Sequence, residues 1–158
     1  MGIYRFLLRE DLEERKEFLP ARADVRATGW DVRCAAPDGI EVQPSEYIMV
    51  PLGWRVYCPP GGWLELRPRS STFTKKHLHA LYGVVDESYE GEVFFACQYL
   101  PPTDSPRTIE FGERIAQVVP MQRDMLVVKE CNTVQLKELF QKRGGGRGSG
   151  GFGSTGDG

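Results

Sequence analysis

The sequence has little of what several classes of protein need. Basic residues are not in excess, because 20 Lys and Arg stand against 22 Asp and Glu, for a formal net charge of −2. That balance argues against a protein that holds nucleic acid through a broad positive surface. No apolar run reaches the ~18 residues of a membrane-spanning helix, and the start of the chain is too acidic for a secretory signal. We therefore expect a cytoplasmic protein with no membrane contact and no direct contact with nucleic acid.

Cysteine and histidine are also scarce. Cys34, Cys58, Cys97 and Cys131 lie far apart and form no Cys-x-x-Cys pair. We expect reduced, buried thiols rather than disulfides or a zinc site. The only histidines, His77 and His79, are interpreted as structural or surface residues.

The length of 158 residues fits one domain, and a hydrophobic fraction of 41% allows a packed core. The end of the chain differs, because more than half of the residues from Gly144 onward are glycine. Such a segment buries too little surface to offset its ordering entropy. We predict a β domain over residues 1–142 and a flexible, glycine-rich segment over residues 143–158.

Short runs rich in β-branched and aromatic residues recur between Gly/Pro turns, which predicts an all-β sandwich or barrel. Glu10–Leu19 and Thr133–Lys142 have weaker helical patterns near the ~12-residue limit for an isolated helix, and we favour a helix in neither. The runs expected to form strands are Tyr47–Val50, Trp54–Cys58, Trp63–Arg67, Leu81–Val85, Glu92–Leu100, Arg114–Pro120 and Met125–Lys129.

The glycine-rich end also carries polar and aromatic residues that a plain linker does not need. Arg147 offers a fork of donors that matches a phosphate, and glycines let backbone N–H groups approach phosphate oxygens. Phe152 offers a face for base stacking, and Ser154 and Thr155 add hydroxyl donors. Composition alone leaves a linker and a nucleotide-binding lid equally open.

Two further stretches have an ordinary and a functional interpretation. Arg69, Ser70 and Ser71 follow an apolar strand and suit phosphate binding, although a turn with an exposed Arg and a helix cap explains them as well. Asp86 lies in a polar turn between apolar runs, a hairpin pattern, and a lone Asp there is most often an ordinary turn residue. Glu87, Glu90 and Glu92 are interpreted as solvated charges.

Taken together, these stretches resemble the motifs of the trimeric dUTPase family, in order, over about residues 27–156. The third motif, Gly83-Val-Val-Asp86-x-x-Tyr89-x-Gly91, and the fifth, Arg147-Gly-Ser-Gly-Gly-Phe-Gly-Ser-Thr-Gly156, are specific in themselves. The others are Thr28-Gly-Trp-Asp31-Val32, Pro68-Arg-Ser-Ser71 and Gly112-Glu-Arg-Ile-Ala-Gln117. Departures are Ser71 in place of a common glycine, extra glycines before Arg147, and a longer, more charged N-terminal stretch.

The resemblance implies hydrolysis of dUTP to dUMP and pyrophosphate, with Asp86 activating the attacking water. Tyr89 would exclude a ribose 2′-hydroxyl. The pocket for uracil, beside Tyr89, would be formed by Gly83, Val84, Val85 and Phe94.

It also implies a jelly-roll-like subunit in a homotrimer with shared active sites, in which residues 133–142 form an arm to a neighbour. Mg²⁺ would be the cofactor, held by the substrate phosphates without direct protein ligands, with Asp31 in its outer shell. The phosphates and the closing lid would involve Arg69, Ser70, Ser71, Gln117, Arg147, Gly151, Phe152, Gly153, Ser154 and Thr155.

Three other interpretations stay open. A dCTP deaminase, with or without dUTPase activity, shares this fold and a similar Arg-Ser-Ser pattern, but it lacks the glycine-rich end and a Tyr three residues after the Asp. A signalling protein could retain the scaffold and act through a partner that binds the charged N-terminal stretch. A structural jelly roll such as a coat protein explains the strands and leaves the end of the chain unexplained.

Overall fold

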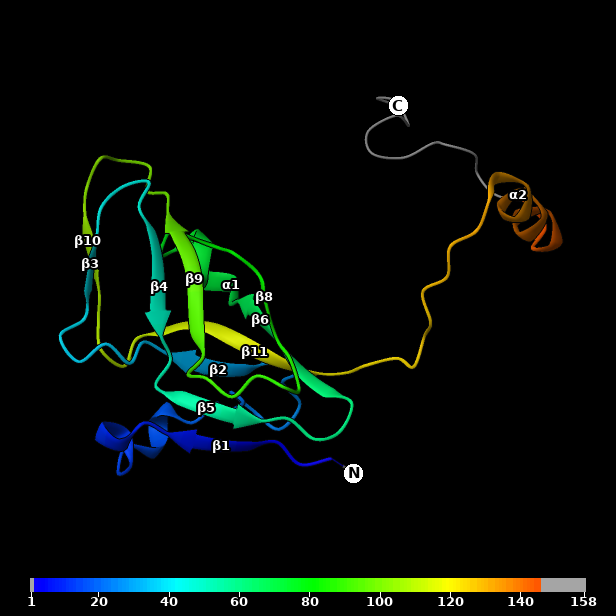
Figure 1. The fold of residues 1–158 in the computed structure, drawn as a ribbon. Helices are drawn as coiled ribbons and strands as arrows, with labels where there is room; N and C mark the ends of the chain where they lie inside the picture. The colour runs from blue at the N-terminus through cyan, green and yellow to red at the C-terminus, as the bar shows by residue number, and fades with distance from the viewer. Residues whose placement is uncertain (1, 146–158) are drawn as a thin grey trace. The chain divides into compact units, whose positions relative to one another are not determined.

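A computed structural model describes residues 2–145 of the chain. The chain divides into two units, Met1–Asp124 and Met125–Gly158. The first unit contains the strands, as Figure 1 shows, and the second contains one helix, α2. No helix among the described residues is long and apolar enough to cross a membrane.

The strands of the first unit form small antiparallel sheets, so the expected all-β, jelly-roll-like fold is confirmed. The largest sheet has the order β2-β11-β6-β8, and a second has the order β4-β9-β7. Two further pairs are β1-β5 and β10-β3. The strand bounds are β1 Arg5–Leu8, β2 Trp30–Arg33, β3 Ile40–Val42, β4 Tyr47–Pro51, β5 Trp54–Tyr57, β6 Gly62–Pro68, β7 Leu78–Ala80, β8 Gly83–Val85, β9 Phe94–Tyr99, β10 Arg107–Ile109 and β11 Arg114–Gln122.

The core follows from the period-2 alternation of these strands. In β6 and β9, every second side chain is buried while its neighbours are partly or fully exposed. The buried faces meet around the fully enclosed side chains of Trp54, Phe18 and Phe95. Burial of each large apolar side chain stabilises the fold by roughly 1.5–3 kcal/mol.

Six of the expected strands form, with ends that differ by one or two residues, but the strand expected at Met125–Lys129 does not form. Its apolar side chains are almost fully exposed, with Val128 at 99%. A strand needs a partner for its backbone hydrogen bonds, and β propensity cannot replace that partner. Strands β1, β2, β3, β7 and β10 were not expected, because runs of three or four residues carry little periodic signal.

The helical segments differ from expectation in one place. Glu10–Leu19 forms two 3₁₀ turns, η1 (Glu10–Leu12) and η2 (Lys16–Phe18), rather than a helix. Our expectation against a helix at Thr133–Lys142 was wrong, because helix α2 spans these residues. Its N-cap is Asn132, whose side chain accepts a hydrogen bond from Gln135 N (2.9 Å), while Asn132 N donates to Gln135 Oε1 (2.9 Å). This capping box satisfies two end groups and was missed in the sequence.

Two smaller expectations are also corrected. Strands β8 and β9 belong to different sheets, so residues 83–94 are a crossing between sheets and not a hairpin. The cysteines are free thiols, as expected, and Cys34, Cys58 and Cys97 are buried. Cys131 is exposed, however, because it lies outside the β core in the second unit.

Candidate active site

The segment that follows β8, residues 86–93 (the 86–93 loop), begins at Asp86 beside the start of β6. Val85 pairs with Leu64 in the antiparallel register, so the next position, Asp86, lies level with Trp63. The Asp86 side chain is exposed, and it lines a hollow of about 510 Å³. The other lining residues are Gly61, Gly62, Trp63, Val84, Glu87, Ser88 and Arg123.

Contacts to the neighbouring strands fix the start of the 86–93 loop. Glu87 Oε2 accepts a hydrogen bond from Gly61 N (2.9 Å) and forms an ion pair with Arg123 (3.2 Å). Glu87 is therefore not simply a solvated charge, as the sequence suggested. Arg123 was missed as a cation beside Asp86, because only the pairing of β6 with β11 brings it there.

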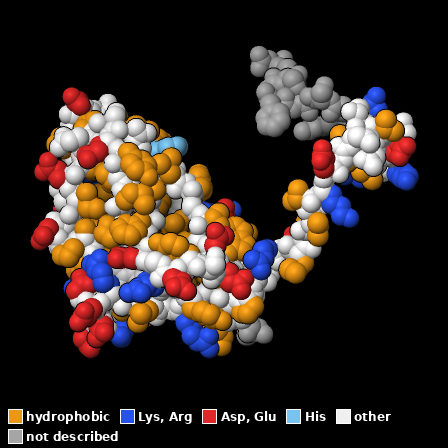
Figure 2. Space-filling model, in the orientation of Figure 1, with side chains coloured by type: hydrophobic (Ala, Val, Ile, Leu, Met, Phe, Trp, Pro, Cys, Tyr) orange, Lys and Arg blue, Asp and Glu red, His pale blue; other side chains and the backbone are white. Residues whose placement is uncertain are grey.

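A second, apolar hollow of about 380 Å³ shares one lining residue, Val84, with the first. Figure 2 shows hydrophobic side chains gathered over β4 and β9 on this face of the molecule. The hollow brings together all the residues that the resemblance assigned to the base and sugar pocket: Gly83, Val84, Val85, Tyr89 and Phe94. Sequence reasoning missed Tyr47, Met49, Leu66, Leu81, Tyr82, Val93 and Ala96, which also line it.

The Tyr89 ring has a defined place in this hollow. Its hydroxyl donates a hydrogen bond to the backbone oxygen of Glu92 (2.7 Å). A Cβ on residue 91 would lie only 2.5 Å from Tyr89 Oη and 2.7 Å from Cζ. Gly91 is thus required for the ring to lie over the backbone of the 86–93 loop.

A second group of expected site residues lies at the other end of β6. Arg69 Nε donates to Asp31 Oδ1 (2.8 Å), and the Arg69 side chain is only 26% exposed, which argues against a merely exposed arginine. Gln117 Nε2 donates to the backbone oxygen of Pro68 (2.8 Å). Ser70 and Ser71 begin the short helix α1 (Ser70–Thr74) directly after Arg69. The structure therefore brings Asp31, Arg69 and Gln117 into one cluster.

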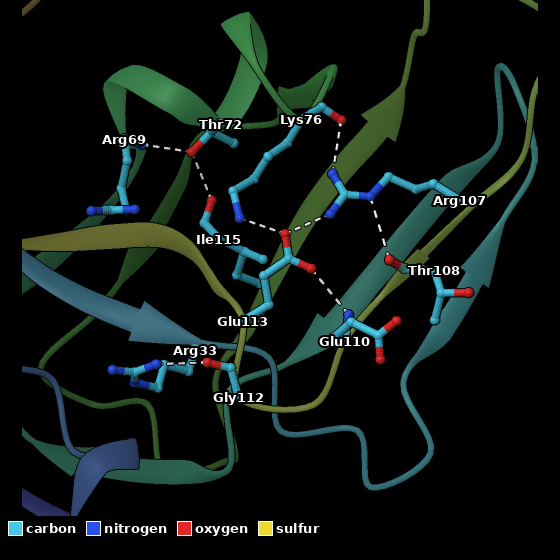
Figure 3. A network of polar contacts seen from close by, with 10 residues as sticks. All are labelled: Arg33, Arg69, Thr72, Lys76, Arg107, Thr108, Glu110, Gly112, Glu113 and Ile115. Atoms are coloured by element: carbon cyan, nitrogen blue, oxygen red, sulfur yellow. Dashed lines mark hydrogen bonds and ion pairs between the residues drawn. The ribbon is translucent and has the colours of Figure 1, made fainter.

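A buried threonine fixes the backbone of this cluster, as Figure 3 shows. The hydroxyl of Thr72 donates to the backbone oxygen of Ile115 (2.7 Å) and accepts from Arg69 N (2.8 Å). Thr72 is fully buried, so both bonds are shielded from water. Sequence reasoning missed Thr72, because its partner lies on β11.

A charged network supports the same region from the side of β10, also in Figure 3. The Glu113 carboxylate accepts hydrogen bonds from Lys76 Nζ, from an Arg107 amino group (2.5 Å) and from Glu110 N (3.0 Å). Burial alone would raise the pKa of Glu113, but these hydrogen bonds outweigh it and hold the pKa below its usual value. Glu113 thus ties the fourth motif to the residues after α1.

The two groups lie far apart within one chain. Asp86 is level with Trp63, and Arg69 follows β6 six positions later. At ~3.3 Å per residue, the strand separates them by roughly 20 Å. A single copy of the chain therefore does not bring Asp86 to Arg69.

Several expected site residues lie outside the described residues, namely Arg147, Gly151, Phe152, Gly153, Ser154 and Thr155. Within residues 2–145, no group of three or more His, Cys, Asp or Glu side chains is arranged to hold a metal ion. Asp31 lies beside Arg69 and near Arg114 (3.5 Å).

Comparisons with known proteins identify the family of the chain. The dUTPase family profile matches residues 16–156. The deoxyuridine 5'-triphosphate nucleotidohydrolase of Hydrogenobaculum sp. is 36% identical, with 94% of each chain covered. The enzyme of the same name from Rhizobium rhizogenes is 35% identical, covering 87% of this chain and 85% of the relative. A crystal structure of dUTPase from Streptococcus mutans matches with a TM-score of 0.68 and 30% identity, covering 79% of this chain and 98% of that one. The chain therefore belongs to the dUTPase family, and it is a hydrolase of the dUTP diphosphatase class.

Proposed function

We propose that this chain hydrolyses dUTP to dUMP and pyrophosphate by in-line attack of water on the α-phosphorus. One observation carries the proposal: the hollow lined by Gly83, Tyr89 and Phe94 and the hollow lined by Asp86 share a lining residue, Val84. A base and sugar in the first hollow leave the phosphates to extend toward the second. The hydrolysis limits uracil in DNA and supplies dUMP for dTMP synthesis.

In this mechanism, Asp86 accepts a proton from the attacking water. The water oxygen forms a bond to the α-phosphorus as the bond to the bridging oxygen breaks, and pyrophosphate leaves with the electron pair. A positioned general base contributes roughly 10²–10⁴-fold. Asp86 is exposed and lines its hollow, which gives both water and phosphate access to the carboxylate.

Selectivity for base and sugar arises in the apolar hollow. Main-chain groups of β8 read the edge of uracil, and the packed walls leave no space for the methyl group of thymine. The Tyr89 ring packs against the deoxyribose and occupies the place that a ribose 2′-hydroxyl would take. A site rejects a wrong nucleotide most strongly when binding it would leave a polar group without a hydrogen-bond partner. A steric difference the size of a methylene group gives only ~10–200-fold discrimination.

Arg69, Ser70, Ser71 and Gln117 bind the phosphates in this proposal. Mg²⁺, when bound, would neutralise charge on the substrate phosphates, and Asp31 would support it through water. The support is that Asp31 already lies beside Arg69 (2.8 Å), so a carboxylate and a phosphate-binding arginine share one location.

The roughly 20 Å between Asp86 and Arg69 supports a shared site in a homotrimer, in which one subunit supplies Asp86 and another supplies Arg69. We propose that residues 133–142 form an arm to a neighbour. Helix α2 has no buried residue, and its apolar side chains Leu136, Leu139 and Phe140 are all at least 42% exposed.

Residues 147–156 would close over the nucleotide as a lid. A reducing, cytoplasmic location fits the three buried free thiols.

The test is pyrophosphate release with Mg²⁺ from dUTP, dCTP, dTTP and UTP side by side, with ammonia release measured in parallel. We expect turnover of dUTP alone. Asp86→Asn should lower turnover by at least ~10²-fold while dUTP binding persists. Glu90→Gln, an exposed carboxylate in the same loop, is the matched control and should be neutral. Ammonia from dCTP would indicate a deaminase, and binding of dUTP without turnover would indicate a scaffold that acts through a partner.

A further inference from the structure

The 86–93 loop is anchored at its far end by the side chain of Glu92. Glu92 Oε1 accepts hydrogen bonds from Arg9 (3.1 Å) and from Gly53 N (3.1 Å). Both side chains are largely shielded, at 25% exposed for Glu92 and 30% for Arg9. This carboxylate was expected to be solvated, and it instead joins three segments that are distant in sequence.

Gly53 gives the anchor a fixed geometry. Its φ of +76° is in the left-handed region, where glycine carries no steric penalty. A Cβ there would lie 2.4 Å from Leu12 Cδ1 and 2.7 Å from Ala35 Cβ. The turn between β4 and β5 is therefore packed tightly, and its N–H points at Glu92 from a rigid position.

Arg9 lies directly after β1 and uses its whole guanidinium group in this region. It donates to both oxygens of Asp11 (2.6 and 2.9 Å) and to the backbone oxygen of Ala35 (2.7 Å), in addition to Glu92. Arg9 N donates to Gly53 O (2.8 Å). Partners other than Glu92 therefore also fix the orientation of the Arg9 guanidinium group.

Glu92 also holds Tyr89, because its backbone oxygen accepts the Tyr89 hydroxyl (2.7 Å). The position of that oxygen depends on how firmly the side chain of the same residue is held. We propose that Arg9, through its ion pair with Glu92, positions the Tyr89 ring and so sets the discrimination between deoxyribose and ribose nucleotides. This inference rests on the proposed function, and it assigns a positioning role to the charged N-terminal stretch.

The experiment compares kcat/KM for dUTP and UTP in wild type, Arg9→Ala, Arg9→Lys and Glu92→Gln. A looser Tyr89 admits the 2′-hydroxyl, so the dUTP:UTP ratio should fall roughly fivefold in Arg9→Ala, a fold-change typical of coupled neighbours. The change should appear mainly as a lower KM for UTP. Arg9→Lys should restore most of the ratio, because an ammonium group can still pair with Glu92.

The matched control is Arg15→Ala. Arg15 pairs with Glu17 two residues later, as Arg9 pairs with Asp11, but its contacts are to Glu17, Phe18 and Phe111 and not to the 86–93 loop. It should leave the ratio unchanged. The double variant Arg9→Ala/Glu92→Gln should be no worse than the poorer single variant, because both changes remove the same pair.

Turnover of dUTP by wild type tests the proposed function, whereas the ratio in the variants tests this inference. A ratio within twofold of wild type in Arg9→Ala, or equal losses for both nucleotides, would overturn it. If Arg9→Ala does not fold, Glu92→Gln decides, since it retains an acceptor for Gly53 N and loses the charge that pairs with Arg9. An unchanged ratio in Glu92→Gln would likewise overturn the role.

Discussion

The side chain of Gln117 fills the space above Gly29. Its Oε1 lies 1.9 Å from the position that a Cβ on residue 29 would take. From there, Gln117 Nε2 reaches the backbone oxygen of Pro68 (2.8 Å), directly before Arg69. The glycine of the first motif, the glutamine of the fourth and the start of the second are therefore one packed unit across β2, β11 and β6.

Gly29→Ala should displace Gln117 and break its bond to Pro68. Because a partly buried hydrogen bond is then lost, we expect a decrease of roughly 0.5–1.5 kcal/mol in the free energy of unfolding, measured by urea denaturation. In Gln117→Ala the clash is absent, so Gly29→Ala/Gln117→Ala should be no less stable than Gln117→Ala alone. Additive losses would show that Gly29 has a different role.

The strands with clear alternation could be predicted from the sequence, and so could the residues that gather around Tyr89. β6 and β9 have a buried residue at every second position, and Gly83, Tyr89 and Phe94 lie within one short stretch of chain. Local patterns are sufficient where neighbouring residues share a face or a loop. The expected strand at residues 125–129 failed because its local pattern requires a partner strand.

Long-range contacts could not be predicted in the same way. In the sequence, Thr72 resembles an ordinary helix residue, and only the fold shows its hydrogen bond to Ile115 O. Likewise, Glu92 resembles a surface charge in the sequence, and only the fold shows its hydrogen bonds from Arg9 and Gly53. These contacts join positions 39 to 83 residues apart, and no spacing rule relates such positions. Charged side chains are the hardest case, because the same residue type serves on the surface and in a shielded pair.

The separation of Asp86 and Arg69 leads to a complementation test. If each site takes Asp86 from one subunit and Arg69 from another, Asp86→Asn and Arg69→Ala should each be inactive alone and active when co-expressed. Random assortment in a closed homotrimer leaves about a quarter of the sites intact. Co-expression of Asp86→Asn with Asp86→Asn/Arg69→Ala is the control and should give no recovery. The absence of recovery in the first pair would place both residues in one subunit's site.

Glu113 should make the free energy of unfolding depend on pH in the acidic range. Its pKa is held below the usual value of 4.5, so its contribution is present above pH 4.5 and is lost as the pH falls through the folded value. Glu113→Gln should cost roughly 1–3 kcal/mol at pH 7, because Lys76 and Arg107 lose a shielded partner. The difference from wild type should shrink steadily below pH 4.5 in urea titrations.

Glu65→Gln is the matched control for the Glu113 prediction, because Glu65 pairs with Arg67, whose side chain is 49% exposed. Because water screens the half-exposed Arg67, this pair contributes less than about 1 kcal/mol. A difference between Glu113→Gln and wild type that stays constant down to pH 3 would contradict the proposed origin of the acid dependence.

Removal of residues 147–158 should leave the oligomeric state unchanged and strongly lower the turnover rate. In the proposed function this segment supplies Arg147 to the phosphates and Phe152 for stacking, and loss of such positioning should cost at least ~10²-fold in turnover. Gel filtration should give an unchanged oligomer, and pyrophosphate release should give the rate. Removal of residues 157–158 alone is the control. An unchanged rate after the longer deletion would mean that the segment is only a linker.

Gly91→Ala should alter selectivity more than stability. The φ of residue 91 lies outside the left-handed region, so alanine adds no backbone strain, and the clash is with Tyr89 Oη and Cζ, at 2.5 and 2.7 Å. The ring must therefore move and release the backbone oxygen of Glu92. We expect a roughly tenfold fall in the dUTP:UTP ratio of kcat/KM, within the range of steric discrimination, and a loss of unfolding free energy below about 1.5 kcal/mol. When the ring is absent, in Tyr89→Ala, the further change Gly91→Ala should have no effect on the ratio. A Gly91→Ala protein that retains the wild-type ratio would show that the placement of the ring over Gly91 does not govern the choice of sugar.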